Sequence, residues 1–301
     1  MTDVSGIRPI RTIVLSAMFL FFIVPAEAAS QPHKKGRFTA VFEQYSPLSD
    51  AKSISNRMVV NVEQYPDKKH QYDIAQESFE VYVPDCYDSN TPFGLIVWIP
   101  AGTSGGIEPC NVKPLMDKHK LVWVGANNSG NKERTYERRI PLALDAAYNM
   151  QKLYNIDPNR VYVAGISGGG RVASVAAIHY SDVYNGGIFI IGANYWENMP
   201  VPDTNSYFRV GAPRPRPGNL LRAKKFGRYV LLTGDTDDNR LEMHTYYEQG
   251  FSKCLDHVLY IQVPGMGHTM PPAEELEKAL KYVDKPLSQK AKQVQTTKKK
   301  R

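Results

Sequence analysis

The sequence has little cysteine, since Cys86, Cys110 and Cys254 are the only three in 301 residues. A small domain held together by disulfides is therefore excluded, and no pair has the spacing of metal ligands, so we expect no metal site. An odd count leaves at least one thiol unpaired. Cys86 and Cys110 flank a predicted strand at Leu95–Ile99 and could form a bridge, or both could be unpaired and buried.

Long hydrophobic runs are also scarce, and the most apolar one covers only Ile13–Val24. A bilayer span needs about 20 residues, so this run is too short for a membrane helix. Arg8 and Arg11 precede it, and the small residues of Ala26-x-Ala28 follow it, which is the pattern of an export signal. We predict that residues 1–28 are a signal peptide cleaved after Ala28, that the protein is secreted or periplasmic, and that no membrane span remains. An uncleaved anchor is the alternative.

Acidic residues are absent from the last segment, residues 285–301, which holds seven Lys and Arg residues. This segment accounts for the whole formal charge of +7, and residues 29–284 are neutral. A nucleic-acid groove needs basic residues spread over a folded face, so we expect no nucleic-acid partner. The tail is predicted to be a basic, disordered end, with contact to an anionic surface as the alternative.

The body of the chain alternates short apolar runs with segments of helical periodicity, which is typical of a mostly parallel sheet covered by helices on both faces. The predicted strands are Phe79–Val83, Leu95–Ile99, Leu121–Val124, Val161–Ala164, Ile188–Ile191, Tyr229–Leu232 and Leu259–Val263. The predicted helices are Leu142–Tyr154, Val172–His179 and Leu276–Tyr282. We therefore expect an α/β domain over residues 78–284, an amino-terminal extension over residues 29–77, and a surface excursion at Tyr207–Lys225.

The strongest chemical signal is a serine between two glycines, Gly165-x-Ser167-x-Gly169, where a predicted strand runs into a helix. Small neighbours allow a tight strand-to-helix turn that would expose the Ser167 hydroxyl at the carboxyl edge of the sheet. Ser167 is therefore a candidate nucleophile. A structural serine in a glycine turn is the simplest alternative.

Other glycines of this turn fit a dinucleotide-binding loop, because Gly168-x-Gly170-x-x-Ala173 matches its alanine-ended form. That loop requires an acid at the end of the next strand, about 20 residues on, to hold the ribose. The sequence has Gly192-Ala193-Asn194 there instead. We therefore expect no cofactor.

A serine hydroxyl becomes nucleophilic when an imidazole removes its proton and a carboxylate orients that imidazole. Three aspartates follow the strand at Tyr229–Leu232, of which Asp237 is the first choice, Asp235 the second and Asp238 the third. A calcium loop is the alternative, but the glycine and terminal glutamate of an EF-hand are missing. His268 lies in a glycine-rich turn after the last predicted strand and is the best candidate base.

Attack on an acyl group produces a negative oxygen that needs hydrogen-bond donors. We assign the backbone N–H of Gly168 and that of Thr103, which lies in the loop after Leu95–Ile99. Tyr195 and Trp196 follow the strand after the serine, and could wall a substrate pocket or simply pack.

These residues together resemble the α/β-hydrolase superfamily, and within it the secreted esterases similar to polyhydroxybutyrate depolymerases and feruloyl esterases. The resemblance covers most of residues 78–284 and is most specific at Asn155–Gly170 and Gly265–His268. It implies that Ser167 is the nucleophile, Asp237 the orienting acid and His268 the base, acting through an acyl-enzyme. The sequence departs from the pattern at Ala101-Gly102, where family members usually have His-Gly.

The sequence therefore predicts an exported serine hydrolase that cleaves carboxylic esters, with a small-molecule or oligomeric ester as its partner. One alternative is a serine peptidase of the prolyl-oligopeptidase type, although we expect no propeller-like domain. The other is an inactive binding protein on a hydrolase scaffold, which only the altered Ala101-Gly102 loop suggests.

Overall fold

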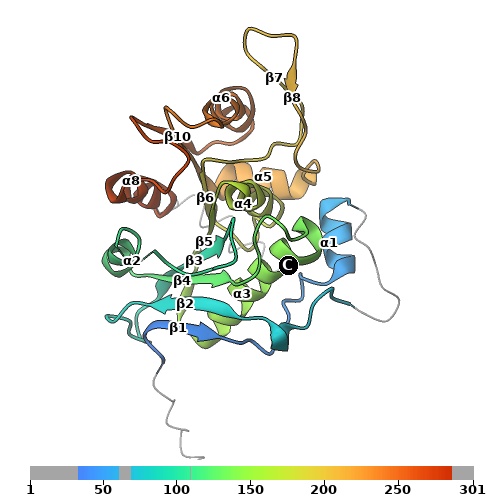
Figure 1. Cartoon of the computed structure of the whole chain (residues 1–301). Coiled ribbons are helices and arrows are strands. Elements are labelled where there is room, and N and C mark those ends of the chain that lie inside the picture. The colour runs from blue at the N-terminus through green and yellow to red at the C-terminus, as the bar shows by residue number, and fades with distance from the viewer. Residues whose placement is uncertain (1–32, 61–68, 109, 287–301) are drawn as a thin grey trace, which may run out of the picture. The chain divides into compact units, whose positions relative to one another are not determined.

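In the computed structural model, which describes residues 33–60, 69–108 and 110–286, eight strands form one central sheet (Figure 1). Across the sheet the strand order is β1-β2-β4-β3-β5-β6-β9-β10. The strands are β1 (Gly36–Ala40), β2 (Phe79–Val83), β3 (Phe93–Ile99), β4 (Leu121–Ala126), β5 (Ile156–Ile166), β6 (Gly186–Ile190), β9 (Arg228–Gly234) and β10 (Val258–Val263). A separate two-stranded hairpin pairs β7 (Met199–Pro200) with β8 (Tyr207–Phe208).

The sheet is antiparallel only at the β1 edge, where β1 pairs with β2 and β2 pairs with β4. All other neighbouring pairs in it are parallel. The prediction of a mostly parallel sheet with covering helices is therefore confirmed. Because the carboxyl ends of parallel strands share one edge, the loops after β3, β5, β9 and β10 can converge there.

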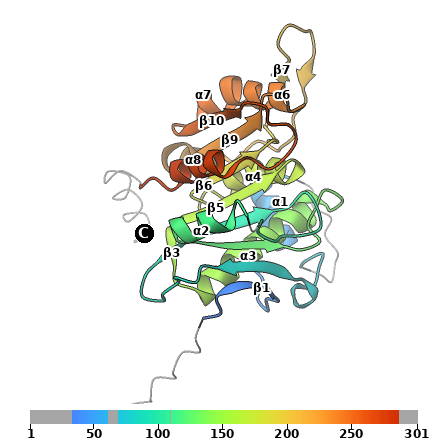
Figure 2. The same ribbon diagram turned by 60° about the vertical axis from the view of Figure 1, so that its left-hand side comes forward.

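Helices cover both faces of this sheet (Figure 1, Figure 2). The α-helices are α1 (Ala51–Met58), α2 (Lys113–His119), α3 (Ile140–Leu153), α4 (Gly168–His179), α5 (Pro217–Phe226), α6 (Arg240–Thr245), α7 (Ser252–Cys254) and α8 (Ala273–Val283). Short helical turns are η1 (Ile74–Gln76), η2 (Thr135–Arg139) and η3 (Tyr246–Phe251). Within the described residues, no helix has both the length and the apolar character needed to cross a bilayer.

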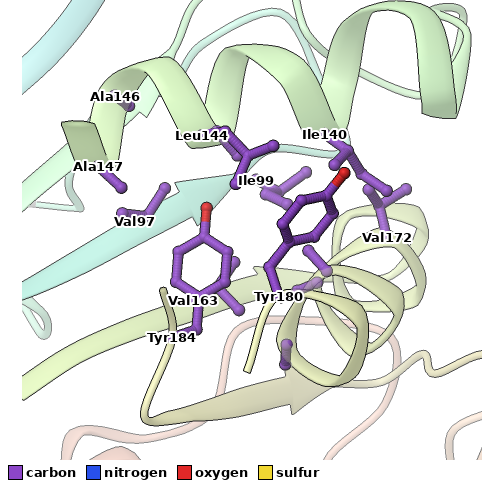
Figure 3. Packing of buried hydrophobic residues seen from close by; sticks show 14 of the residues in the cluster. Val97, Ile99, Ile140, Leu144, Ala146, Ala147, Val163, Val172, Tyr180 and Tyr184 are labelled. Atoms are coloured by element: carbon purple, nitrogen blue, oxygen red, sulfur yellow. The ribbon is translucent and has the colours of Figure 1, made fainter. Parts of the chain in front are cut away.

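The core forms two layers because successive strand residues point to opposite faces. Val97 and Val163 face the layer under α3 and α4, whereas Trp98 and Ala164 face the layer under α2 and α8. Figure 3 shows the first layer, in which α3 lies over β3 and the hydroxyl ends of the Tyr180 and Tyr184 rings point toward α3. This two-sided burial explains why the strands read as continuous apolar runs.

The domain begins earlier than the sequence pattern indicates, because the expected extension over residues 29–77 supplies both β1 and α1. Strand β1 pairs with β2 along its length, and Ile54 and Met58 of α1 are fully buried in the core. The described residues from His33 onward belong to one compact unit. Polar residues dominate this segment, so its few anchoring side chains gave no periodic signal.

Helix α1 is joined to residues that lie far along the chain. The guanidinium of Arg57 pairs with the carboxylate of Asp182, just after α4. The guanidinium of Arg216, at the start of α5, donates to the carbonyl oxygen of Asn56 at 2.7 Å. The amino-terminal helix is therefore fixed by contacts from the second half of the domain.

The sequence left open whether Cys86 and Cys110 form a bridge or are unpaired and buried. They form no bridge, and both are free thiols that are exposed rather than buried. Part of the expected excursion Tyr207–Lys225 is α5, which buries Ala223, and Asn219 donates its side-chain N–H to the carbonyl of His179 on α4 at 2.8 Å. The predicted signal peptide, and all but Lys285 and Pro286 of the predicted tail, lie outside the described residues.

Candidate active site

Ser167 occupies the turn between β5 and α4, with a backbone φ of 54° and ψ of −122°. A positive φ is unfavourable for a residue with a Cβ, so the surrounding structure must impose it. The Ser167 N–H donates to the carbonyl of Ile190 at 2.8 Å, which ties the turn to β6. The result is a serine side chain raised at the carboxyl edge of the sheet.

The flanking glycines are required by close approach of the backbone. A Cβ on Gly169 would overlap the carbonyl oxygen of Ile99, and one on Gly165 would lie only 2.8 Å from that same oxygen. The Gly-x-Ser-x-Gly pattern thus reflects packing of the turn against the end of β3. Gly170, which belongs to the spacing that also fitted a dinucleotide loop, is required for a similar reason, since a Cβ there would lie 2.5 Å from the carbonyl oxygen of Gly192.

His268 lies in the loop after β10, and its Nε2 is 2.9 Å from the Oγ of Ser167. Gly265 gives this loop its bend, with a φ of +70°. The carboxylate of Asp235 accepts the Gly265 N–H at 2.7 Å, which joins the loops after β9 and β10. Asp235, the second choice as orienting acid, therefore braces the histidine loop instead.

Asp237 completes the hydrogen-bonded chain, because its Oδ2 lies 2.7 Å from the Nδ1 of His268. Its side chain is fully buried, whereas that of His268 is 49% exposed. The N–H of Asn239 donates to the other carboxylate oxygen at 2.7 Å. A carboxylate at Nδ1 places the proton there and leaves Nε2 free to accept the serine proton. Asp238, the third choice, is exposed.

The structure therefore brings together Ser167, His268 and Asp237, which come from three separate loops at the same sheet edge. The order serine, acid, histidine along the chain is that of α/β hydrolases. The arrangement has the geometry of a hydrogen-bonded triad and is open to solvent at His268. Chemically it can remove the proton of the Ser167 hydroxyl as the oxygen attacks.

The loop after β3, residues 100–106, is held by the loop after β4, residues 127–131. Backbone N–H groups of Asn128 and Asn131 donate to the carbonyls of Thr103 and Ala101, at 2.7 and 2.9 Å. The side-chain oxygen of Asn127 accepts the Gly105 N–H at 3.0 Å. Thr103 itself is exposed, and Gly168 begins α4. Both expected oxyanion donors thus lie in segments next to the Ser167 turn.

A buried arginine that sequence reasoning missed supports these two loops. Arg139 is only 4% exposed, and its guanidinium donates to the carbonyl of Pro100 at 2.8 Å and to that of Ser129 at 3.0 Å. Burial lowers the pKa of Arg139 to about 10. No local motif marks this residue, since its partners lie 10 and 39 positions away.

Arg171 forms a second connection that was not anticipated. It lies one helical turn after Ser167, and its guanidinium makes a two-pronged ion pair with the carboxylate of Glu242 on α6. The same guanidinium donates to the carbonyl of Ala193 at 3.0 Å. The helix that begins at the serine is thereby joined to the segment that carries Asp237.

Tyr195 and Trp196 do not form the substrate wall expected of them. They are 4% and 7% exposed, and their rings stack on each other with centroids 4.1 Å apart. The ring of Phe251 packs edge-on against both. The two rings therefore belong to the core, because η3, which contains Phe251, covers them.

Comparisons with solved structures identify the fold. Fluorophosphonate-binding serine hydrolase F of Staphylococcus aureus, in a substrate-bound structure, aligns with a TM-score of 0.54 and 12% identity over 83% of this chain and 99% of that one. S-formylglutathione hydrolase of Staphylococcus aureus aligns with a TM-score of 0.50 and 13% identity over 69% of this chain and 92% of that one. Esterase 2 of Thermogutta terrifontis gives 0.50 and 15%, over 74% and 94%. The chain has the α/β-hydrolase fold, as the sequence predicts.

Similarity in sequence to curated proteins is low. Dipeptidyl peptidase 4 of Felis catus is 24% identical over 248 residues, which are 71% of this chain. The chain covers only 31% of the length of that curated relative. No protein-family model matches the chain.

Proposed function

We propose that this protein is a serine hydrolase that cleaves carboxylic esters through an acyl-enzyme intermediate. The observation that carries the proposal is the continuous hydrogen-bonded chain from Ser167 through His268 to the buried carboxylate of Asp237. A serine held at a strained turn and paired with an oriented imidazole is the arrangement that activates a hydroxyl for attack. A solvent-open site also supplies water, the second substrate.

In the proposed reaction, the Oγ of Ser167 bonds to the ester carbonyl carbon while its proton moves to Nε2 of His268. The carbonyl oxygen becomes negative and accepts hydrogen bonds from the backbone N–H groups of Gly168 and Thr103. The imidazolium then gives its proton to the leaving alcohol, and Asp237 stabilises the charged ring. Water, deprotonated by the same imidazole, releases the acid and restores Ser167.

The direct test removes the nucleophile. Ser167→Ala should lower kcat on a short-chain aryl ester by on the order of 10⁶-fold, because the triad acts as a unit. A fluorophosphonate probe should label the wild-type protein at Ser167 and should leave the variant unlabelled. An unchanged rate in the variant would refute the proposal, and a wild-type protein that neither turns over nor labels would favour the inactive scaffold.

A peptidase is the second candidate, because the curated relative that the chain matches is dipeptidyl peptidase 4. Ester and amide hydrolysis share the triad and differ in the leaving group, since an amine must be protonated before it departs. A panel of aryl esters and matched aryl amides of amino acids and dipeptides separates the two. The ester proposal requires a much higher kcat/KM on the esters, with slow turnover of the dipeptide amides.

Export belongs to the same proposal. The signal at residues 1–28 would be removed after Ala28, so a protein expressed with its native amino terminus should be recovered from a secreting host with Ala29 as its first residue. Retention of Met1 would contradict the signal. Contact of the basic tail with an anionic surface is the alternative to a solvated, disordered end, and binding to anionic vesicles with and without residues 285–301 separates the two.

A further inference from the structure

Asn131 is placed beside the Ser167 turn by the loop after β4. Its backbone N–H donates to the carbonyl of Ala101 at 2.9 Å, which anchors it to the loop that carries Thr103. The neighbouring Gly130 lies so close that a Cβ there would be 2.7 Å from the Ala101 carbonyl oxygen. The backbone of Asn131 is therefore fixed against the loop after β3.

The side chain of Asn131 fills the space that Gly168 leaves by having no side chain. A Cβ on Gly168 would lie 2.6 Å from the Cγ and 2.8 Å from the Nδ2 of Asn131, and would overlap the amide oxygen as well. Gly168 is the residue whose N–H is proposed to meet the negative oxygen. The amide of Asn131 therefore lies beside the residue that would supply the first donor, and a further donor to that oxygen must come within about 3 Å of it.

This amide is available to a substrate. Asn131 is exposed, and within the described part of the chain its side chain forms no hydrogen bond. The contrast with Asn127 in the same loop is informative, because the Asn127 side chain accepts the Gly105 N–H and donates to Ser78 and Glu80. An amide carries two N–H donors, and a half turn about the last bond exchanges its oxygen and nitrogen.

We propose that the Asn131 side chain is a third hydrogen-bond donor to the carbonyl oxygen of the substrate, beside the N–H groups of Gly168 and Thr103. The inference rests on the proposed ester hydrolysis. The Nδ2 N–H meets the oxygen as it becomes negative, and it stabilises the tetrahedral state more than the uncharged ester. Arg139, which holds the carbonyl of Ser129, keeps this loop in place before the substrate arrives.

The experiment compares Asn131→Ala and Asn131→Asp with the wild-type protein on a short-chain aryl ester. Loss of one such donor costs on the order of 10²-fold in kcat, so Asn131→Ala should show that loss with KM within about twofold of the wild-type value. Asn131→Asp keeps the shape but puts a negative charge beside the negative oxygen, and should lose more. The matched control is Asn205→Asp, which adds the same charge at an exposed position between β7 and β8, outside the loops of the site, and should keep the wild-type kcat.

A second measurement separates a donor from a structural role. An alkyl boronic acid forms a tetrahedral adduct with the serine, and its affinity should fall in Asn131→Ala by the same factor as kcat/KM. The melting temperature should not change. Equal kcat values for wild type and Asn131→Ala, or a lower kcat explained by a lower melting temperature with boronate affinity unchanged, would overturn this inference alone. A wild-type protein without esterase activity or fluorophosphonate labelling would overturn the proposed function as well.

Discussion

Replacing Ser167 by glycine and by alanine separates the cost of the turn from the loss of the hydroxyl. Both substitutions remove the nucleophile, so both proteins should be inactive. Only glycine adopts a φ of 54° and ψ of −122° without steric strain. Residues with a Cβ held in such regions cost about 1–3 kcal/mol each. Glycine itself costs about 0.5–1 kcal/mol in chain entropy relative to alanine.

The balance of these two effects predicts that Ser167→Gly is more stable than Ser167→Ala by about 1 kcal/mol. In a domain of this size that difference corresponds to roughly 2–4 °C in melting temperature. Urea unfolding measures it directly, provided that both variants show the same dependence of free energy on urea concentration. The sign is the informative result, since glycine is normally the destabilising residue.

A matched pair at an ordinary site supplies the control. Lys281 lies in the last turn of α8, so Lys281→Ala should be more stable than Lys281→Gly by about 1 kcal/mol. If Ser167→Ala were the more stable protein at the turn as well, the turn would not be strained, and the account of how the fold presents the nucleophile would be refuted.

Two further outcomes follow from buried charged groups. Burial raises the pKa of Asp145 to about 6 from 3.8, so the folded protein holds this proton more tightly than the unfolded chain. The stability contributed by protonated Asp145 is complete below about pH 4 and is lost as the pH rises through 6. The free energy of unfolding of the wild-type protein should therefore fall, relative to that of Asp145→Asn, by up to about 3 kcal/mol between pH 4 and 7. A difference in urea unfolding that does not change with pH would contradict this. Arg139→Met leaves the carbonyls of Pro100 and Ser129 without their donor, and should cost about 2–3 kcal/mol of stability and about tenfold in kcat; calorimetry and ester turnover check both, and an unchanged kcat would exclude Arg139 from supporting the loop.

Much of the architecture could be predicted because strands buried on both faces must be apolar throughout. Each of the seven predicted strands corresponds to a strand of the sheet, and β5 differs mainly in starting at Ile156 rather than Val161. The candidate triad was also within reach, since each member follows a strand and parallel strands end at one edge. The choice of Asp237 over its neighbours rested on the length of chain needed to reach that edge.

What could not be predicted depends on contacts between distant residues. The buried Arg139 and the ion pair of Arg171 with Glu242 use residues that look like ordinary surface charges in the sequence. Nothing in the sequence marks Asn131 either, because its side chain occupies the space left by the missing side chain of Gly168. Tyr195 and Trp196 were candidates for a substrate pocket because the position of an aromatic residue after a strand does not distinguish a buried ring from a pocket wall.

The attachment of α1 affects the order in which the protein can be made. A ribosome delivers this helix early, yet Asp182, which pairs with Arg57, is synthesised 125 residues later, and Arg216 follows Asn56 by 160. Such long separations slow folding, because much chain must be ordered before the contacts form. These two polar contacts of α1 can therefore form only after the ribosome has synthesised Asp182 and Arg216, so the attachment of this helix is completed late in translation.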